Sequence, residues 1–393
     1  MRIIVVLILS FSLTCSFAQK VALEKANQLI GNKKYESAFE VLNAADPLHQ
    51  NPEIVIAKTN LCLKYFVTSI MHKFFALKDL EPEEEIMDIR GSEGSFSIFT
   101  FAPDSVIKPL LEKYPDHYNL RKTLGYYYHE VHLKYPQDWL EPDSIVIQRF
   151  LDNYKIAYDH GIYDYWSVYG IGYAYLMKQN YQSSIPFLRK SAELKYDYPS
   201  SHYNLAYAYL YTNQREKGIK SAKAAMELYE YPHYKADAAR MIALMYKELK
   251  NFEKAREYYL KADTIQSNDY YTLKPLLDLE ILLNKESYPD RTKQFFLVAP
   301  ENPTIYKDLM EIYRHAYKTD ELLTFLSSQH EQYQKDNKVN GNLHFYKAVI
   351  QYHEKDFENS RTHFEKSREL FEKVYGPNHR VFEAIDSYIR DLQ

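Results

Sequence analysis

The stretch that decides the fold is one in which a short pattern returns three times: KQNYQSS at 178–184, NQREKG at 213–218 and KNFEKA at 250–255. In each copy a polar turn leads into an aromatic residue or an arginine, and a small residue stands three positions later. Measured at the aromatic or arginine position, successive copies lie 34 and 37 residues apart. A step of this length holds two helices and two short turns, so the pattern predicts consecutive helix hairpins.

The same pattern extends outward in both directions. It occurs as NKKYESA at 32–38 and as KDFENS at 355–360, and two weaker copies stand near 286–288 and 318–320. Helical spacing of apolar residues between the copies supports the hairpin interpretation. A single hairpin of this kind cannot bury its apolar faces, so neighbouring hairpins are expected to stack on one another.

The composition agrees with a helical protein. The chain has 393 residues but only 10 glycines, while a many-stranded β fold needs glycine at its left-handed turn positions. Tyrosine is abundant, with 39 residues. The net charge of −4 gives no general attraction to nucleic acid.

Three consecutive units resemble the tetratricopeptide repeat family at its signature positions. These positions hold Ile171, Gly172, Tyr175, Tyr181, Ser184 and Leu188, then Leu205, Ala206, Tyr209, Gly218, Ala222 and Ala225, then Ile242, Ala243, Tyr246, Phe252, Ala255, Tyr259 and Ala262. The resemblance covers most of residues 20–390. It implies an all-α, right-handed superhelical solenoid of helix hairpins, closed by a C-terminal cap helix within 377–392.

Residues 1–18, MRIIVVLILSFSLTCSFA, are typical of a secretory signal peptide. Arg2 precedes an apolar run that is too short to span a bilayer, and small residues at Ser16 and Ala18 suit a signal peptidase. We therefore expect an exported protein, periplasmic or secreted. A lipid anchor at Cys15 and a buried N-terminal helix are the alternatives.

The rest of the chain is expected to comprise N-terminal repeat-like helices at 19–80, an insertion loop at 81–105, and the solenoid with its cap at 106–393. Charged residues interrupt the apolar region 54–77, so it is predicted to be a long buried helix, with no transmembrane span in the mature chain. The aromatics of 81–105 fit a loop that packs on neighbouring helices or a flap that contacts a partner.

Motifs for catalysis are absent from the sequence. It has no GxxxxGK[ST], HExxH, CxxC or GxSxG, so we predict no enzyme and no cofactor. His129 and His132 could offer two metal ligands, but no third ligand has motif spacing, and surface histidines without a metal are the expectation. Gly170 and Gly172 are expected to serve helix packing, and Cys62 to be a small buried residue.

Tyrosines recur at helical spacing. Tyr203, Tyr207 and Tyr211 follow one another every four residues, and Tyr169 and Tyr173 hold the matching places one unit earlier. The family resemblance implies that these positions face a concave groove. The predicted groove residues are Tyr126, Tyr169, Tyr173, Tyr203, Tyr207, Tyr211, Arg240 and Leu244. The alternative is that this chain simply uses tyrosine everywhere.

These observations predict a non-enzymatic scaffold, exported from a bacterial cytoplasm, that binds a protein or extended peptide along a tyrosine-lined groove. Tyrosine suits this role because it buries a large area at small entropic cost. The alternative is a carbohydrate- or small-ligand-binding module of the cell envelope, since aromatic faces also stack on sugars. An enzyme is the third possibility.

Overall fold

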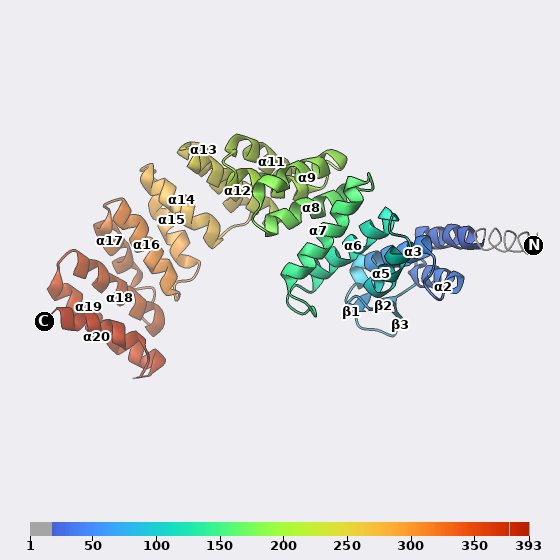
Figure 1. The fold of residues 1–393 in the computed structure, drawn as a ribbon. Helices are drawn as coiled ribbons and strands as arrows, with labels where there is room; N and C mark the ends of the chain where they lie inside the picture. The colour runs from blue at the N-terminus through green and yellow to red at the C-terminus, as the bar shows by residue number, and fades with distance from the viewer. Residues whose placement is uncertain (1–17, 377, 393) are drawn as a thin grey trace, which may run out of the picture. The chain divides into compact units, whose positions relative to one another are not determined.

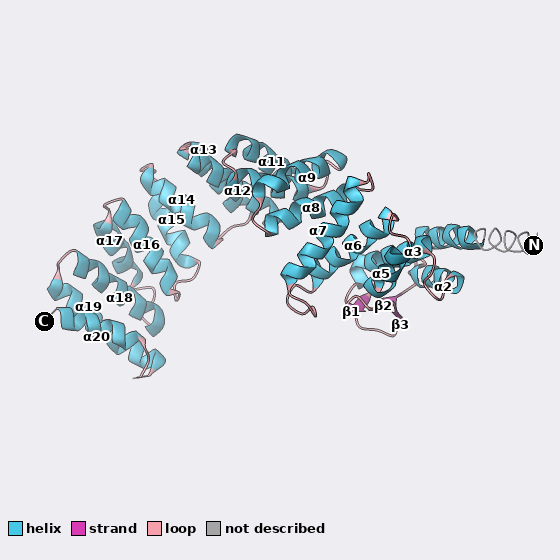
Figure 2. Cartoon of the chain, viewed as in Figure 1, coloured by secondary structure: helices cyan, strands magenta, loops and turns pink. Residues whose placement is uncertain are grey.

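The computed structural model describes residues 18–376 and 378–392. It divides the chain into two compact units, which we call unit 1 (residues 1–212) and unit 2 (residues 213–393). Helices dominate both units, and within each unit consecutive helices pair across short turns (Figures 1 and 2). The all-α solenoid of helix hairpins is confirmed. The predicted signal peptide lies, up to Phe17, outside the described residues.

Unit 1 contains a helix that includes residues 18–31, nine labelled helices in its described part, and three short strands. These elements are α2 (Tyr35–Ala45), α3 (Pro52–Tyr65), β1 (Thr68–Ile70), β2 (Phe74–Leu77), α4 (Ile86–Ile89), β3 (Ser97–Thr100), α5 (Pro103–Lys113), α6 (Tyr118–Lys134), α7 (Asp143–Asp159), α8 (Tyr165–Met177), α9 (Tyr181–Leu194) and α10 (Pro199–Tyr211).

Unit 2 is helical throughout its described residues. Its elements are α11 (Arg215–Leu228), α12 (Pro232–Glu248), α13 (Phe252–Ile265), α14 (Tyr270–Leu282), α15 (Tyr288–Leu297), α16 (Pro303–His315), α17 (Thr319–Gln329), α18 (Asn337–His353), α19 (Phe357–Tyr375) and α20 (Val381–Asp391).

The turn of the repeated pattern has the same conformation each time. In the clear copies the residue two positions before the aromatic or arginine has a positive φ, at Lys33, Gln179, Asn213, Lys250 and Lys355. In the weaker copies Asn284 and Tyr317 have a positive φ just after the first helix of the hairpin. The next N–H then donates to a carbonyl five residues earlier, as in Asn180 to Tyr175 at 2.8 Å, which ends the first helix of the hairpin. The two weaker copies share this turn, so they are genuine members of the repeat.

The small residue three positions after the aromatic place is buried in the clear copies. Ala38, Ser184, Ala255 and Ser360 are fully buried, and Gly218 is buried as well. A larger side chain would hold the two helices of each hairpin apart, because protein interiors are close-packed. The repeated small residue therefore sets the helix spacing within the hairpins.

The prediction of one helix across 54–77 is wrong after residue 65. α3 ends at Tyr65, and the chain continues into β1 and β2, which pair antiparallel. Met71 and His72, with φ of 52° and 43°, form the two-residue turn, closed by a 3.0 Å bond from Lys73 N–H to the Ile70 carbonyl. Such hairpin turns are normally signalled by Asn-Gly, which this chain lacks here.

The segment 81–105 is more ordered than the predicted loop. It contains α4 and also β3, which pairs antiparallel with β2 to complete a three-stranded sheet in the order β1-β2-β3. The expected packing of its aromatics on a helix is confirmed, because the rings of Phe99 and Phe101 lie 4.5 and 6.0 Å from that of Phe39 on α2.

One tyrosine ring sets the packing of three helices in unit 1. The fully buried ring of Tyr154, on α7, lies against Gly125 of α6 and Gly170 of α8. A Cβ added at either glycine would meet a ring carbon of Tyr154 at 2.6 Å, which is too close for any real contact. Gly172 likewise faces Leu188 at 2.6 Å. The predicted packing role of the glycines at 170 and 172 is confirmed.

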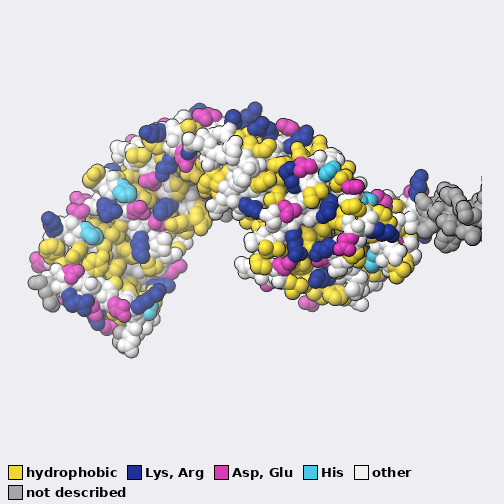
Figure 3. Space-filling view, in the orientation of Figure 1, with side chains coloured by type: hydrophobic (Ala, Val, Ile, Leu, Met, Phe, Trp, Pro, Cys, Tyr) yellow, Lys and Arg dark blue, Asp and Glu magenta, His cyan; other side chains and the backbone are white. Residues whose placement is uncertain are grey.

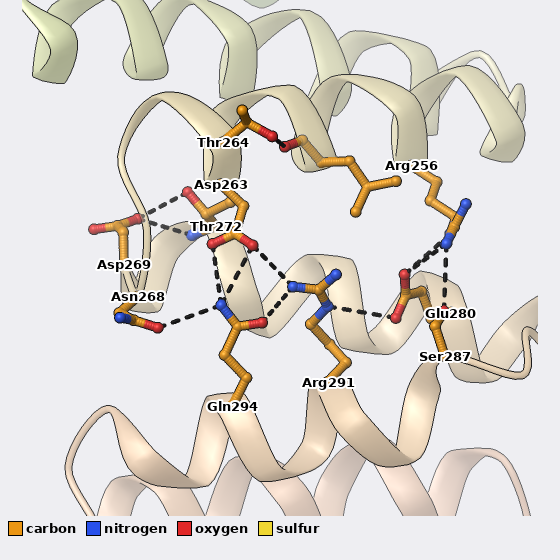
Figure 4. Close-up of polar contacts among 11 residues, drawn as sticks. Arg256, Asp263, Thr264, Asn268, Asp269, Thr272, Glu280, Ser287, Arg291 and Gln294 are labelled. Carbon is orange, nitrogen blue, oxygen red and sulfur yellow. Dashed lines mark hydrogen bonds and ion pairs between the residues drawn. The ribbon is translucent and has the colours of Figure 1, made fainter.

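Unit 2 buries a charged network between α13, α14 and α15 (Figure 4). Glu280 is fully buried, and Arg256 reaches it at 2.9 Å. Arg291 also approaches Glu280, at 3.5 Å, and pairs with Asp263 at 2.9 Å. A buried carboxylate is tolerated only when its charge is compensated, so the network couples these three helices.

The C-terminal helix covers the end of unit 2. Phe382 and Ile385 of α20 are buried in one cluster with Phe364 and Phe371 of α19. The predicted cap helix is therefore present. Within residues 18–376 and 378–392, no helix combines the length and the apolar character that crossing a membrane requires.

Replacing Gly170 by alanine should destabilise unit 1 by about 1–3 kcal/mol, because the new methyl group must displace the Tyr154 ring. Thermal unfolding followed by circular dichroism measures this. Gly31→Ala is the matched control: it lies at the end of the first helix with nothing within 4 Å of an added Cβ, so alanine should be neutral or stabilising there. Equal changes in melting temperature at both positions would contradict the close packing of Gly170 against the Tyr154 ring.

Candidate binding site

The structure distributes the predicted groove residues over both units. Six of them, Tyr126, Tyr169, Tyr173, Tyr203, Tyr207 and Tyr211, lie on α6, α8 and α10 of unit 1. The helix α8 contacts both α6 and α10. The remaining two, Arg240 and Leu244, lie on α12 of unit 2.

The Arg240 side chain pairs with residues of unit 2. Its guanidinium pairs with Asp237 and, at 2.9 Å, with Asp269, and it also donates to Thr272 at 3.0 Å. The arginine therefore joins α12 to the start of α14. Leu244, by contrast, is exposed.

The expectation that Tyr169 is exposed is wrong. Only 8% of the residue is accessible, because Trp166, Tyr173 and Tyr198 surround its ring at centroid distances of 5.2–5.8 Å. Its hydroxyl accepts a hydrogen bond of 2.9 Å from Asn204 Nδ2. Tyr169 thus belongs to the packing between α8 and α10.

A second aromatic group lies at the far end of α10. Tyr207 is half-buried, Tyr211 is 55% exposed, and their rings lie 4.7 Å apart. Tyr181, at the start of α9, stacks on Tyr211 at 4.6 Å. The hydrogen bond with Tyr211, followed by burial, raises the pKa of Tyr207 to about 12. Tyr203 is half-buried on the same helix.

Tyr126 lines a cavity of about 430 Å³ in unit 1. Helices α3, α6 and α7, together with the start of α8, contribute its walls. The lining residues are Asn60, Lys64, Lys122, Thr123, Tyr126, Glu130, Tyr154, Asp164, Tyr165, Trp166 and Ser167. Four aromatic side chains, two lysines and two carboxylates therefore meet at one cavity.

The pKa values of the two carboxyl groups at the cavity, Glu130 and Asp164, are shifted in opposite directions. Burial raises the pKa of Glu130 to about 7, although Arg90 opposes the shift, and the Glu130 carboxyl group has no hydrogen-bond partner within the described residues. Burial also disfavours ionised Asp164, but hydrogen bonds from Ser167 and Lys122 outweigh it and hold the Asp164 pKa below its usual value. Near neutral pH, Asp164 is charged and Glu130 titrates.

Sequence reasoning missed Glu130, Asp164 and Trp166. Glu130 stands four residues after Tyr126, so the two share a helix face, and this spacing was an available signal. Asp164 accepts from Ser167 N–H at 2.8 Å in a capping box, a local signal for the start of α8 rather than for a site. Trp166 carried no periodic signal.

The two predicted surface histidines are both buried. His129 is fully buried, its ring stacks on Phe150 and Trp166 at 4.7 and 4.9 Å, and neither ring nitrogen has a partner. His132 contacts Asp143 at 2.6 Å and the Tyr173 hydroxyl at 3.2 Å. In the part of the chain that the structure describes, no group of three side chains could hold a metal.

The interpretation of Cys62 as a small buried residue is confirmed. The thiol is free and fully buried, and burial raises its pKa well above the usual value. It therefore stays protonated at neutral pH and is unsuited to act as a nucleophile.

Glu130→Gln should make unit 1 more stable above pH 7, by about 1–3 kcal/mol. The folded chain holds the Glu130 proton up to about pH 7, whereas an ordinary glutamate loses it near pH 4.5, so wild-type stability falls as pH rises between these values. Urea unfolding near pH 5 and near pH 8 measures the change. The exposed Glu24→Gln control should leave the pH dependence unaltered, and a wild-type-like profile for Glu130→Gln would refute burial of the carboxyl group.

His129→Leu should change how the stability of unit 1 depends on pH below about 6.5. Burial lowers the pKa of His129 to about 3, so wild-type stability is lost as pH falls below about 6.5, where the unfolded chain takes up the proton. The leucine variant keeps a similar volume and should gain about 1–2 kcal/mol relative to wild type between pH 8 and pH 5. A constant difference at both pH values would show that His129 does not titrate as a buried group.

Two segments of the chain match a known family of repeats. Residues 199–231 and 236–269 match the family model described as "Tetratricopeptide repeat". No curated protein matches the chain.

Solved structures with a similar arrangement are remote. YrrB, described as a tetratricopeptide repeat protein with an unusual peptide-binding site, is 17% identical over 44% of this chain and 81% of its own, with a TM-score of 0.38. A tetratricopeptide repeat protein from Parabacteroides merdae is 14% identical over 73% and 98%, with a TM-score of 0.40. MamA from Desulfovibrio magneticus is 17% identical over 44% and 92%, with a TM-score of 0.36. These likenesses carry no argument about the site.

Residues 199–231 and 236–269 are therefore tetratricopeptide repeats, and the other helix hairpins of the chain repeat the same arrangement of paired helices.

Proposed function

We propose that the protein is a non-enzymatic scaffold that binds a protein or an extended peptide across unit 1. The proposal rests on the accessible aromatic side chains of α6, α8, α9 and α10, which we call the aromatic face. They are those at the cavity, Tyr126 and Trp166, and the group formed by Tyr181, Tyr207 and Tyr211. In Figure 3 the visible face of unit 1 mixes hydrophobic and charged side chains.

The chemistry of the aromatic face suits a partner segment with a polar anchor. Tyrosine and tryptophan rings bury a large area with few rotatable bonds, which is why they dominate interface energetics. Glu130 lacks a hydrogen-bond partner among the residues described, so a donor from the partner would satisfy it. The cavity at Tyr126 would then take one anchoring side chain, while Tyr207 and Tyr211 contact the segment further along.

A carbohydrate or other small ligand is the second candidate. The observation in its favour is the cavity itself, because aromatic rings and carboxylates converge on a volume of about 430 Å³, which is typical of small-molecule sites. A sugar would occupy this cavity alone and leave Tyr207 and Tyr211 untouched. The two candidates therefore differ in which residues they require.

We also propose export, which rests on the signal-like residues 1–18. A mature chain that begins at Gln19 would retain every residue of the aromatic face. Mass spectrometry of the native protein tests this: an intact Met1 would refute export, and a chain that begins at a lipid-modified Cys15 would be exported but anchored to a membrane.

The test compares surface with core tyrosines. Tyr211→Ala and Tyr207→Ala should melt close to wild type, within about 1 kcal/mol, but should weaken partner binding by about 2 kcal/mol if these rings are anchors. Tyr209→Ala is the core control: Tyr209 is buried and accepts from Arg189 at 3.1 Å, so its loss should cost about 3–5 kcal/mol of stability.

Binding is measured with a displayed library of random peptides and with a glycan array. Each is probed with the wild-type protein and with the Tyr207→Ala, Tyr211→Ala double variant. Peptides that bind wild type and are lost by the double variant support the scaffold. Binding only to glycans, unchanged by the double variant and lost with Tyr126→Ala, would replace the scaffold by the carbohydrate module.

A further inference from the structure

A second cavity of unit 1 has a different chemistry. Its volume is about 610 Å³, and α5, α6 and α7 supply its walls. It lies against Leu124 and Tyr128 of α6, whereas the cavity at Tyr126 lies against Thr123 and Tyr126 of the same helix. The two cavities therefore use different faces of α6.

Each of the three helices brings one cation to the second cavity. Lys108 comes from α5, Arg121 from α6 and Arg149 from α7, and Glu112 is the single acid among the lining residues. Three positive charges and one negative charge leave the lining with a net charge of +2. Lys108 and Arg149 both lie over the ring of Tyr128, at 5.7 and 5.2 Å.

The three cations differ in how they are compensated. Arg149 pairs with Glu141 at 2.5 Å and donates to the Tyr128 hydroxyl at 3.1 Å, and Lys108 lies 3.7 Å from Asp104. The Arg121 side chain has no ion pair or hydrogen bond with any residue that the structure describes, and its Nε is buried. A partly buried guanidinium lowers the stability of the fold unless a nearby anion compensates its charge.

The side-chain amide of Asn153, which also lines this cavity, has one atom without a hydrogen-bond partner within the described residues. Asn153 is only 9% exposed, and its Nδ2 donates to the Arg149 carbonyl at 2.8 Å. Its Oδ1 is buried and has no donor within the described residues. An unpartnered guanidinium and an unpartnered acceptor therefore line the same cavity. Buried polar atoms without partners are rare in native proteins, and a bound ligand is one explanation for them.

We propose that this cavity binds a small molecule that carries a carboxylate or phosphate group, with Arg121 as its principal contact. The guanidinium fork matches either oxyanion in a bidentate arrangement, and Lys108 and Arg149, both over the ring of Tyr128, add positive potential. A hydrogen-bond donor beside the oxyanion would satisfy Asn153. The volume falls in the range of small-molecule sites. The site is independent of the aromatic face.

The experiment measures thermal unfolding of the full chain while inorganic phosphate or acetate replaces chloride at constant ionic strength. A ligand that binds the folded state raises the melting temperature in a saturable way. We expect this response for wild type with at least one of the two anions, which also identifies the preferred class. Arg121→Gln should weaken the response at least tenfold. Its fold should persist, because the substitution removes an uncompensated charge.

Two further variants make the result decisive. Lys25→Gln removes the same charge from an exposed position on the first helix, so it should respond like wild type and reveal any general salt effect. Lys108→Gln alters an exposed side chain at the cavity and should weaken the response even if Arg121→Gln fails to fold. Absence of a saturable response in wild type, or an unchanged response in both cavity variants, would overturn the proposal.

Discussion

The ring of Tyr154 is the constraint on which unit 1 depends. It lies between Gly125 and Gly170, and an added Cβ at either position would come within 2.6 Å of it. Gly125 meets the Cδ1–Cε1 edge of the ring and Gly170 meets the Cδ2–Cε2 edge, so the width of one aromatic ring sets the distance between α6 and α8. Because Tyr126 follows Gly125 and Trp166 precedes Gly170 by one helical turn, the same contact brings both residues to the cavity. The edge of Tyr154 itself lines that cavity, so fold and site share one contact.

The repeat could be predicted from the sequence because it depends on local features. A left-handed residue ends each first helix, and a small residue lets the second approach, and both stand at fixed distances from the aromatic place. The hairpin of β1 and β2 could not be predicted in this way. Its left-handed residues are Met71 and His72, which give no turn signal, and the strands are held by Phe99 and Phe101 from a segment about 25 residues further along.

The site was predictable only in part, for a related reason. Helical spacing places Tyr126, Tyr169 and Tyr207 on first helices, but the exposure of each depends on neighbours from other helices. Tyr169 is enclosed because Trp166 and Tyr198 are large, whereas a small residue at either position would have left it open. Glu130 and Asp164 meet at one cavity only through the packing of α6 on α8, which no sequence spacing records.

Burial acts on α6 in two opposite ways at adjacent residues. It raises the pKa of Glu130 and lowers that of His129, so both are uncharged in the folded chain over a wide range around pH 5–6. Their contributions to the pH dependence of stability have opposite signs between about pH 4.5 and 6.5, and there they partly cancel. The helix can therefore pass through the interior of unit 1 without burying a net charge at this point. Above neutral pH the compensation ends, because Glu130 ionises while His129 stays neutral, and a donor from a bound partner would then stabilise the carboxylate. Ionised Glu130 therefore lowers the stability of unit 1 above neutral pH, and the affinity for a ligand that donates a hydrogen bond to it should be highest in the same pH range.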